Sequence, residues 1–246
     1  TMTGDATPGK PRWAKPVEEL SVGDLPPEAL NLNVAGKQLS GAVQGFGQLW
    51  QKTYRVPLAG AAVTPQEVVK VWKADYTTFW PENSNLYGPV ADLEPGDVGV
   101  INASQSGVKL STGVMVMYAD DESFAFALPQ GHIFAGWITF SAHDEDGTTV
   151  AQVQPYFRTS DPMYELIFKI YFHRKEDEIW YHTLNSLAAR FGVDGQVTHN
   201  AERIDTRRQW RNVGNVWYNA GMRTALHQLA APVRALGRIA GHKPDA

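Results

Sequence analysis

The period with which apolar and polar residues alternate changes along the chain, and each change predicts a different element. In residues 49–58, Trp50, Tyr54 and Val56 stand among Lys52 and Arg55, a pattern typical of a strand. From residue 92 to residue 158, short apolar runs rich in Val, Ile and Phe are separated by glycines and acidic residues. Turn residues at this spacing predict strands that form an antiparallel meander.

Two segments carry the signals of helix starts. Thr64-Pro65-Gln66-Glu67 has the spacing of a capping box, with proline where its missing N–H costs nothing. Asp161-Pro162 predicts the start of a long helix that runs to Phe191 and ends before Gly192. Residues three or four apart share one face of a helix. For the long helix we expect this face to hold Leu166, Ile170, His173, Asp177, Trp180, Leu184, Leu187 and Phe191.

The flanking segments differ from this centre in composition. Residues 1–45 are rich in proline, and we interpret them as an arm and a lead-in without a core of their own. Residues 46–195 are expected to form one domain, and residues 196–246 a basic helical extension. From residue 201 to the end, eight basic residues stand against three acidic ones, a net charge of +5, so the remaining residues carry −9. This asymmetry marks the tail as a separate unit.

Composition narrows the chemistry. The chain has 246 residues, a net charge of −4 and no cysteine, which excludes disulfides, thiolate-bound zinc and a thiol nucleophile. No run of 18 apolar residues predicts a membrane span, and no signal peptide is expected at the N-terminus. The acidic balance argues against general nucleic-acid binding. We expect a cytoplasmic protein.

Motifs of the common cofactor and metal enzymes are missing. The fragment GDATPGK imitates a phosphate-binding loop, but Pro11 follows where Ser or Thr is needed and no strand precedes it. The sequence has no HExxH zinc motif, no GxSxG elbow and no dinucleotide fingerprint. We therefore predict a metal-free site without a cofactor, whose proton-transfer groups are His, Asp, Glu or Tyr.

The predicted order of elements resembles the START / Bet v 1-like (SRPBCC) helix-grip superfamily over about residues 46–192. The resemblance implies an α+β fold in which a curved antiparallel sheet wraps around a long C-terminal helix. Here an N-terminal lead-in and C-terminal helices are added. It also implies a cavity between sheet and helix that takes a hydrophobic or amphipathic small molecule.

The centre of the chain is similar to the bacterial DUF1990-like branch of that superfamily. The matching stretches are residues 96–98, GDV, residues 126–132, FALPQGH, and residues 136–140, GWITF. The branch has a Leu-Pro-x-x-His turn that feeds a Gly-x-x-x-Phe strand, and here Gln130 intervenes before Gly131. Residues 156–162, YFRTSDP, stand in the place of its Arg-Pro segment, although Pro162 comes four residues after Arg158.

Three residues are candidates for acid–base chemistry. His132 follows a Pro-Gln-Gly turn, so it either serves as an acid or base or bonds the turn's backbone. His173 and Asp177 stand four apart in the middle of the long helix. Facing a cavity, a carboxylate beside an imidazole raises its pKa and fixes its tautomer. Facing solvent with the polar run 173–178, the two form a structural pair.

Further residues are candidates for ligand contact. Arg158 suits an anionic group, because its planar fork matches a carboxylate, or else it pairs with Glu165 or Asp177. Aromatic residues offer rings and hydroxyls to a cavity, with core packing as the alternative for each. The candidate ligand-binding set is Trp80, Tyr87, Tyr118, Trp137, Tyr156, Arg158, Ile170 and Tyr181.

Two functions remain open from the sequence. The first is the binding of a lipid-like or polyketide-like molecule between the sheet and the long helix. The alternative is a cofactor-independent cyclase, isomerase or dehydratase that uses His and Asp in the same cavity. The basic tail has three interpretations, namely packing on the sheet, contact with a second copy in a homodimer, or peripheral contact with an anionic membrane.

Overall fold

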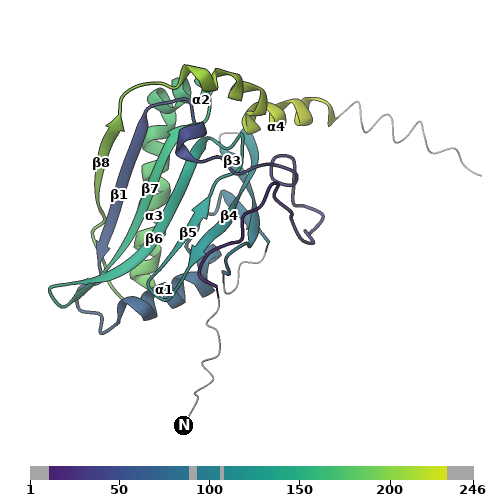
Figure 1. The fold of residues 1–246 in the computed structure, drawn as a ribbon. Helices are drawn as coiled ribbons and strands as arrows, with labels where there is room; N and C mark the ends of the chain where they lie inside the picture. Colours follow the sequence, from purple (N-terminus) through teal and green to yellow (C-terminus); the bar gives the residue numbers. More distant parts are fainter. Residues whose placement is uncertain (1–10, 89–92, 106–107, 232–246) are drawn as a thin grey trace, which may run out of the picture.

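The computed structural model describes residues 11–88, 93–105 and 108–231, although the side chains of residues 105, 108 and 171–173 lie outside this description. A single eight-stranded sheet has the strand order β2-β3-β4-β5-β6-β7-β1-β8, with every neighbouring pair antiparallel (Figure 1). Its strands are β1 Leu49–Pro57, β2 Ser84–Tyr87, β3 Val98–Gln105, β4 Val108–Ala119, β5 Ser123–Ala127, β6 Phe134–Glu145, β7 Thr148–Thr159 and β8 Thr198–Asp205. The predicted meander is therefore confirmed.

The helices lie on one face of this sheet and at one of its ends (Figure 1). They are the short 3-10 turns η1 Ala42–Gln44 and η2 Tyr76–Phe79, then α1 Pro65–Ala74, α2 Pro162–Ile167, a π-helical turn η3 Phe168–Phe172, α3 His173–Arg190, the 3-10 helix η4 Trp210–Tyr218 and α4 Ala220–Leu229. No helix in the described residues has both the length and the apolar character that crossing a bilayer requires.

Both predicted helix starts are confirmed. The Thr64 hydroxyl accepts from the backbone N–H of Glu67, and the Glu67 carboxylate accepts from the backbone N–H of Thr64 at 2.7 Å. The Asp161 carboxylate accepts from the N–H groups of Met163 and Tyr164, which opens α2. Each cap satisfies N–H groups that a first helical turn leaves without partners. The long helix ends at Arg190, one residue before the predicted Phe191, and Gly192 in the turn that follows has a φ of +72°, which suits a glycine.

The expected apolar face of the long helix is only partly correct. Trp180, Leu184 and Leu187 are buried against the sheet, but Leu166 and Ile170 are 63% and 78% exposed. The cause is the π-helical turn η3, which inserts an extra residue and rotates the face that precedes it. In α2 and at the first residue of this turn, the buried positions are Tyr164, Glu165 and Phe168 instead. The predicted cavity residue Ile170 is thus on the outer surface.

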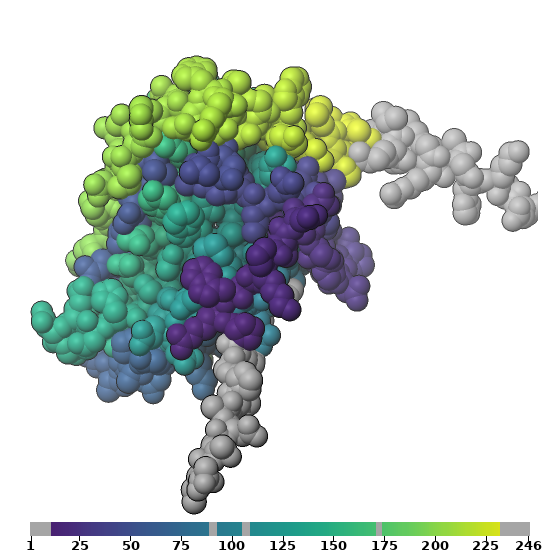
Figure 2. Space-filling view, viewed as in Figure 1, coloured from purple at the N-terminus to yellow at the C-terminus, as the bar shows by residue number. Residues whose placement is uncertain are grey.

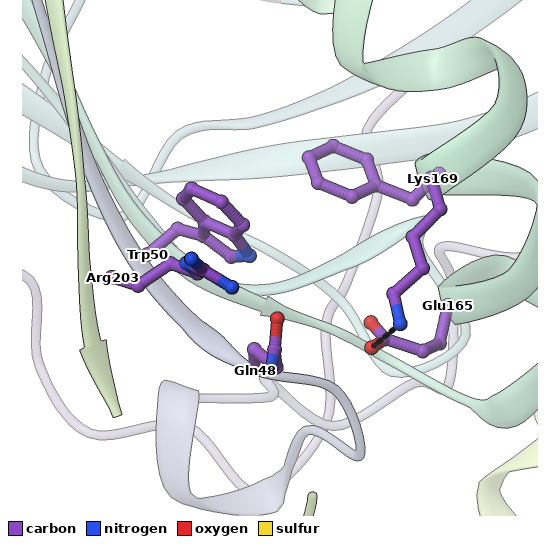
Figure 3. A pocket seen from close by; sticks show the side chains of 6 residues that line it. Gln48, Trp50, Glu165, Lys169 and Arg203 are labelled. Carbon is purple, nitrogen blue, oxygen red and sulfur yellow. Dashed lines mark ion pairs between the residues drawn. The ribbon is translucent and has the colours of Figure 1, made fainter. Parts of the chain in front are cut away.

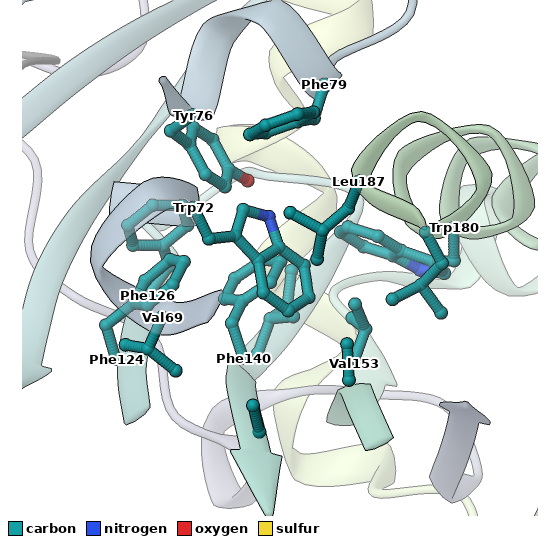
Figure 4. Close-up of a cluster of buried hydrophobic side chains, with 14 of the residues drawn as sticks. Val69, Trp72, Tyr76, Phe79, Phe124, Phe126, Phe140, Val153, Trp180 and Leu187 are labelled. Carbon is teal, nitrogen blue, oxygen red and sulfur yellow. The ribbon is translucent and has the colours of Figure 1, made fainter. Parts of the chain in front are cut away.

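An aromatic cluster fills the space between the sheet, α1 and the middle of α3 (Figure 4). Trp72 of α1 meets Phe124 and Phe140 edge to face, with ring centroids 5.9 and 5.4 Å apart. Tyr76 packs against the same two rings, and Trp180 of α3 contacts Phe140 at 5.8 Å. Burial of such large rings is a major source of stability. The centre of the grip is therefore packed with the protein's own side chains.

The lead-in covers part of the opposite face of the sheet (Figures 1 and 2). Leu20 and Val34 form a second buried cluster with Val98, Val100 and Met115 of β3 and β4. The described part of the lead-in thus shares a buried cluster with the sheet.

The segment after α3 does not start as a helix. Thr198–Asp205 forms the edge strand β8, which pairs with β1 over seven residues. This corrects the expectation that the chain turns helical directly after residue 195, and the helices begin only at Trp210. Asn219 ties this tail to the long helix, because its side-chain amide donates to the buried Asp161 carboxylate at 2.7 Å. The division of the chain into three units stays a prediction.

Candidate functional site

A pocket of about 280 Å³ lies between the sheet and the beginning of the long helix (Figure 3). Strands β1 and β8 form one wall, and α2 with the π-helical turn forms the other. Its lining residues are Gln48, Trp50, Glu165, Phe168, Lys169 and Arg203. The volume is close to the lower limit for small-molecule sites, so the pocket suits a small ligand and not a long lipid chain.

Two aromatic rings give the pocket its apolar part. Trp50 of β1 and Phe168 of the π-helical turn meet edge to face, with centroids 6.4 Å apart. The guanidinium of Arg203 on β8 lies 5.5 Å from the centre of the Trp50 ring, within the range of a cation–π contact. A flat apolar group is the natural companion of such rings.

Cations predominate among the charged lining residues. Lys169 and Arg203 stand against one carboxylate, that of Glu165. Glu165 is buried and already has partners, because it accepts from the Thr159 hydroxyl at 2.9 Å and from Nε of Arg208 at 3.1 Å. The Lys169 ammonium lies 3.8 Å from the same carboxylate. With Glu165 so neutralised, the pocket favours a ligand that carries negative charge.

A buried cluster of charges lies beside the pocket. The Lys52 ammonium is 2.8 Å from both Glu176 and Asp177 of α3, and its side chain is completely buried. It also lies 5.6 Å from the centre of the Phe168 ring, which lines the pocket. Tyr54, on the same face of β1, donates its hydroxyl hydrogen to Asp177 at 2.5 Å. The cluster thus ties β1 to α3 directly behind the pocket.

The surroundings determine where protons reside in this cluster. Burial raises the pKa of Glu176, and the Lys52 ammonium opposes this shift. Burial, together with the Glu176 and Asp177 carboxylates, raises the pKa of the Tyr54 hydroxyl far above its usual value, so Tyr54 stays a donor. One ammonium thus faces two carboxylates, and it is the cation that both of them contact.

Lys52 is one of the polar residues that stand among the apolar positions of its predicted strand. It shares a face with Trp50, Tyr54 and Val56 because side chains two apart point the same way in a strand. That face is the inner one, and the buried carboxylates opposite make the burial of an ammonium tolerable.

His132 occupies a structural position in its turn. Its Nδ1 accepts from the backbone N–H of Phe134 at 3.0 Å. Burial lowers its pKa to about 4, so the ring is neutral near pH 7. The backbone of Tyr218–Ala220 covers the same turn, with Ala220 N–H donating to the Gly131 carbonyl. This geometry corresponds to the backbone-bonding alternative for His132, although here the ring accepts.

The structure describes only one member of the pair predicted on the long helix, Asp177. Asp177 faces inward and is held by Lys52 and Tyr54. The side chain of His173 lies outside the described residues, so its role stays a prediction.

The predicted ligand-binding aromatics are spread over both faces of the sheet. Trp80 belongs to the inner cluster and packs against Trp180 at 6.2 Å. Tyr87 packs against the cluster under the lead-in, and Tyr118 contacts Trp13 at 4.6 Å. Trp137 and Tyr156 are cross-strand partners 4.7 Å apart, at positions that alternate with the core-facing residues of β6 and β7. None of these five lines the pocket.

Two further candidates have structural partners. Arg158 is buried, pairs with Asp205 at 2.7 Å and donates to the Gly47 carbonyl at 2.6 Å. The salt-bridge alternative for Arg158 is therefore observed, with Asp205 in place of the expected Glu165 or Asp177. Tyr181 hydrogen-bonds Nδ1 of His199 on β8 at 2.6 Å.

All six pocket-lining residues were missed as site residues in the sequence. They come from β1, the segment before it, α2, the π-helical turn and β8, and only the pairing of β8 with β1 brings Arg203 to Trp50. The sequence could have pointed to Trp50 as an inward-facing residue, because the strand that carries it was predicted. Among the described residues, no three His, Asp or Glu side chains gather as a metal ion would require.

Comparison with known proteins found likenesses in structure. Models of known protein families gave no match, and neither did the curated proteins. Protein Ms6760 from Mycobacterium smegmatis is 15% identical with a TM-score of 0.43, over 63% of this chain and 96% of its own. Ginseng major latex-like protein 151 from Panax ginseng is 15% identical with a TM-score of 0.38, over 59% and 99%.

A third similar structure is the di-domain ARO/CYC StfQ from the steffimycin biosynthetic pathway. It is 13% identical with a TM-score of 0.46, over 59% of this chain and 53% of its own. At such identities these likenesses concern the fold alone. The chain has the START / Bet v 1-like helix-grip fold predicted from its sequence, as its own strand order and long helix show. The DUF1990-like branch stays a prediction.

Proposed function

We propose that this protein binds a small amphipathic molecule with a flat apolar body and an anionic group in the pocket between β1, β8 and the π-helical turn. The observation that supports the proposal is the combination of two aromatic rings, Trp50 and Phe168, with the cations Arg203 and Lys169 around about 280 Å³. The rings would contact the apolar body, while the cations would neutralise the anionic group.

The size of the ligand follows from the packing around the pocket. The resemblance to helix-grip proteins implies a cavity between the sheet and the long helix of this chain. Here Trp72, Tyr76, Phe140 and Trp180 occupy the space opposite the middle of α3. The proposed ligand therefore sits at one end of the grip, near the π-helical turn.

Binding is favoured over the alternative of a cyclase, isomerase or dehydratase. Such an enzyme needs a proton-transfer group that reaches the ligand. Of the predicted residues whose side chains the structure describes, neither His132 nor Asp177 lines the pocket, and each is held by partners of its own. Glu165 does line it, but its carboxylate is held by Thr159 and Arg208. A catalytic role for Asp177 would require ligand-induced opening of its contacts with Lys52 and Tyr54.

The test is isothermal titration with 2-naphthoate, which carries a flat apolar body and a carboxylate. We expect saturable binding at one site, and Arg203→Ala should weaken it about tenfold, a loss of about 1.4 kcal/mol. The matched control is Arg190→Ala, an arginine on α3 that pairs with Asp75 at the surface. Equal affinity in wild type, Arg203→Ala and Trp50→Ala would exclude this pocket as the site.

A further inference from the structure

Large apolar side chains are exposed along the tail at one end of the molecule. We call Trp210, Val213, Trp217, Leu226 and Leu229 the tail surface; their exposed fractions are 69, 47, 78, 63 and 77%. They come from η4 and α4, which run across the end of the sheet (Figures 1 and 2). Exposed patches of this kind mark interaction sites on soluble proteins.

The tail surface is the outer side of an amphipathic segment whose inner side is fixed to the body. Asn212 donates to the Gly45 carbonyl at 2.8 Å, and Asn215 donates to the Ser160 carbonyl at 2.8 Å. In α4, Ala220 and Thr224 are completely buried. The polar and small residues thus face the body, while Trp217, Leu226 and Leu229 face outward. Trp210 is also largely exposed, although one edge contacts the buried Phe46 ring at 5.2 Å.

The start of the long helix also exposes apolar side chains. Leu166 and Ile170, which the π-helical turn rotates outward, are 63% and 78% exposed. The tail is joined to this helix, because the N–H of Gly221 donates to the Tyr164 hydroxyl at 2.8 Å. Two different elements therefore contribute exposed apolar side chains to the same end.

Positive charge accompanies the tail surface. From residue 206 to the end, the chain has seven basic residues and one acidic residue, Asp245. Arg207, Arg211 and Arg223 are exposed in the described part. The first 200 residues carry −9 against +5 after them. The described residues 206–231 hold four arginines, Arg207, Arg208, Arg211 and Arg223, and no acidic residue, so an anionic surface would attract this part of the tail.

The charge and side-chain chemistry of the tail surface distinguish between its possible binding partners. A two-fold dimer would place the two basic tail surfaces against each other, which like charges oppose. A nucleic acid would use the arginines but would leave Leu226 and Leu229 in water. A bilayer with anionic headgroups accommodates both the arginines and the apolar side chains. Leucine side chains would enter the acyl region, tryptophan rings would lie at the interface, and arginines would contact the headgroups.

We propose that the tail surface docks on an anionic lipid bilayer. The inference is independent of the pocket, because none of the five residues lines it. Docking would place η4 and α4 along the membrane plane and direct the acidic body away from it.

The experiment is sedimentation of the full chain with vesicles. We expect at least about tenfold stronger association with phosphatidylserine–phosphatidylcholine vesicles than with phosphatidylcholine alone, and a decrease as salt is raised. The double variant Trp217→Ser/Leu226→Ser should lose this association while its circular dichroism is unchanged. The matched control is Trp13→Ser, because Trp13 is 62% exposed but lies on the lead-in.

Four outcomes would overturn the proposal. They are no association with anionic vesicles, equal association with both kinds of vesicle, an equal loss in Trp13→Ser, and a wild-type dimer that Trp217→Ser/Leu226→Ser abolishes. Binding of single-stranded RNA without binding of vesicles would equally contradict it. None of these results depends on whether 2-naphthoate binds the pocket, so the two proposals fail separately.

Discussion

The ammonium group of Lys52 on β1 lies 2.8 Å from the carboxylate of Asp177 on α3, 125 residues away in the chain. The pair is enclosed, with Lys52 fully buried and the Asp177 side chain 15% exposed. Glu176 and Tyr54 complete the contact. The long helix is thus fixed to the sheet by charge directly beside the proposed ligand pocket.

Lys52→Met should destabilise the protein by about 3–5 kcal/mol, because two buried carboxylates lose their cation. The measurement is urea unfolding near pH 7. Lys175→Met is the control, since its pair with Glu178 is partly exposed and such pairs contribute about 1 kcal/mol or less. A loss in Lys52→Met no larger than in the control would mean that the cluster does not hold the helix.

Because His132 is buried, its contribution to the free energy of unfolding should decrease as the pH falls. Its folded-state pKa of about 4 lies below the ordinary 6.5, because burial disfavours the charged ring. The unfolded chain therefore takes up the proton first, and stability present above pH 6.5 is lost on the way to pH 4. At about 1.4 kcal/mol per unit of pKa, the loss reaches about 3 kcal/mol.

The variant for this test is His132→Asn, whose side-chain oxygen keeps an acceptor near Phe134 N–H without a titrating group. Stability is measured by urea unfolding from pH 7 to pH 4. Burial raises the pKa of Asp161 and Glu176, which act in the opposite sense, so the informative quantity is the difference from wild type. His182→Gln, exposed on α3, should keep the wild-type profile. A His132→Asn profile parallel to wild type would be inconsistent with a buried neutral ring.

Gly131→Ala should be more harmful than Gly147→Ala. Both glycines have positive φ, +88° and +80°, which costs a side chain about 1–2 kcal/mol. A Cβ on Gly131 would lie 2.0 Å from the Tyr218 carbonyl oxygen, whereas one on Gly147 meets nothing within 4 Å. Overpacking adds about 1–3 kcal/mol at Gly131 only. Urea unfolding compares the two, and equal losses would show that the tail does not press on this turn.

Asn219→Ala should lower stability by about 2–4 kcal/mol, because it removes the cap of α4 and leaves the buried Asp161 carboxylate without that donor. Thermal unfolding measures the effect. Asn200→Ala, at an exposed position of β8, should change stability by less than about 0.5 kcal/mol. An unchanged melting temperature in Asn219→Ala would mean that the tail is not part of the cooperative fold.

Local signals were enough to predict the elements that begin and end on short-range contacts. The Thr64–Glu67 box and the Asp161 cap involve residues at most three apart, so the sequence displays both partners. Strand β8 shows no apolar alternation, because both its faces are largely exposed. Its strand character arises from pairing with β1, which no local pattern reveals.

The pocket could not be predicted from sequence periodicity, because it depends on two structural features that a periodic pattern does not show. The π-helical turn shifts the inward face from Leu166 and Ile170 to Phe168, so the predicted apolar stripe pointed the wrong residues inward. The pocket then combines Phe168 with Trp50 and Arg203, which lie on strands 150 residues apart. The fold class survived these errors because it rests on the order of elements and not on the rotation of one helix.

The position of β1 has a consequence for how the chain acquires its fold. This strand is the first to be made, yet its neighbours are β7 and β8, with Trp50 opposite both Phe157 and Arg203. Residues 58–147, which are 90 residues, must be synthesised after β1 before the nearer of its two partner strands begins. Such distant pairing slows folding, because a large loop must close before its contacts form. During synthesis, Lys52 and its neighbours therefore wait for their partner strands longer than any other strand of this sheet.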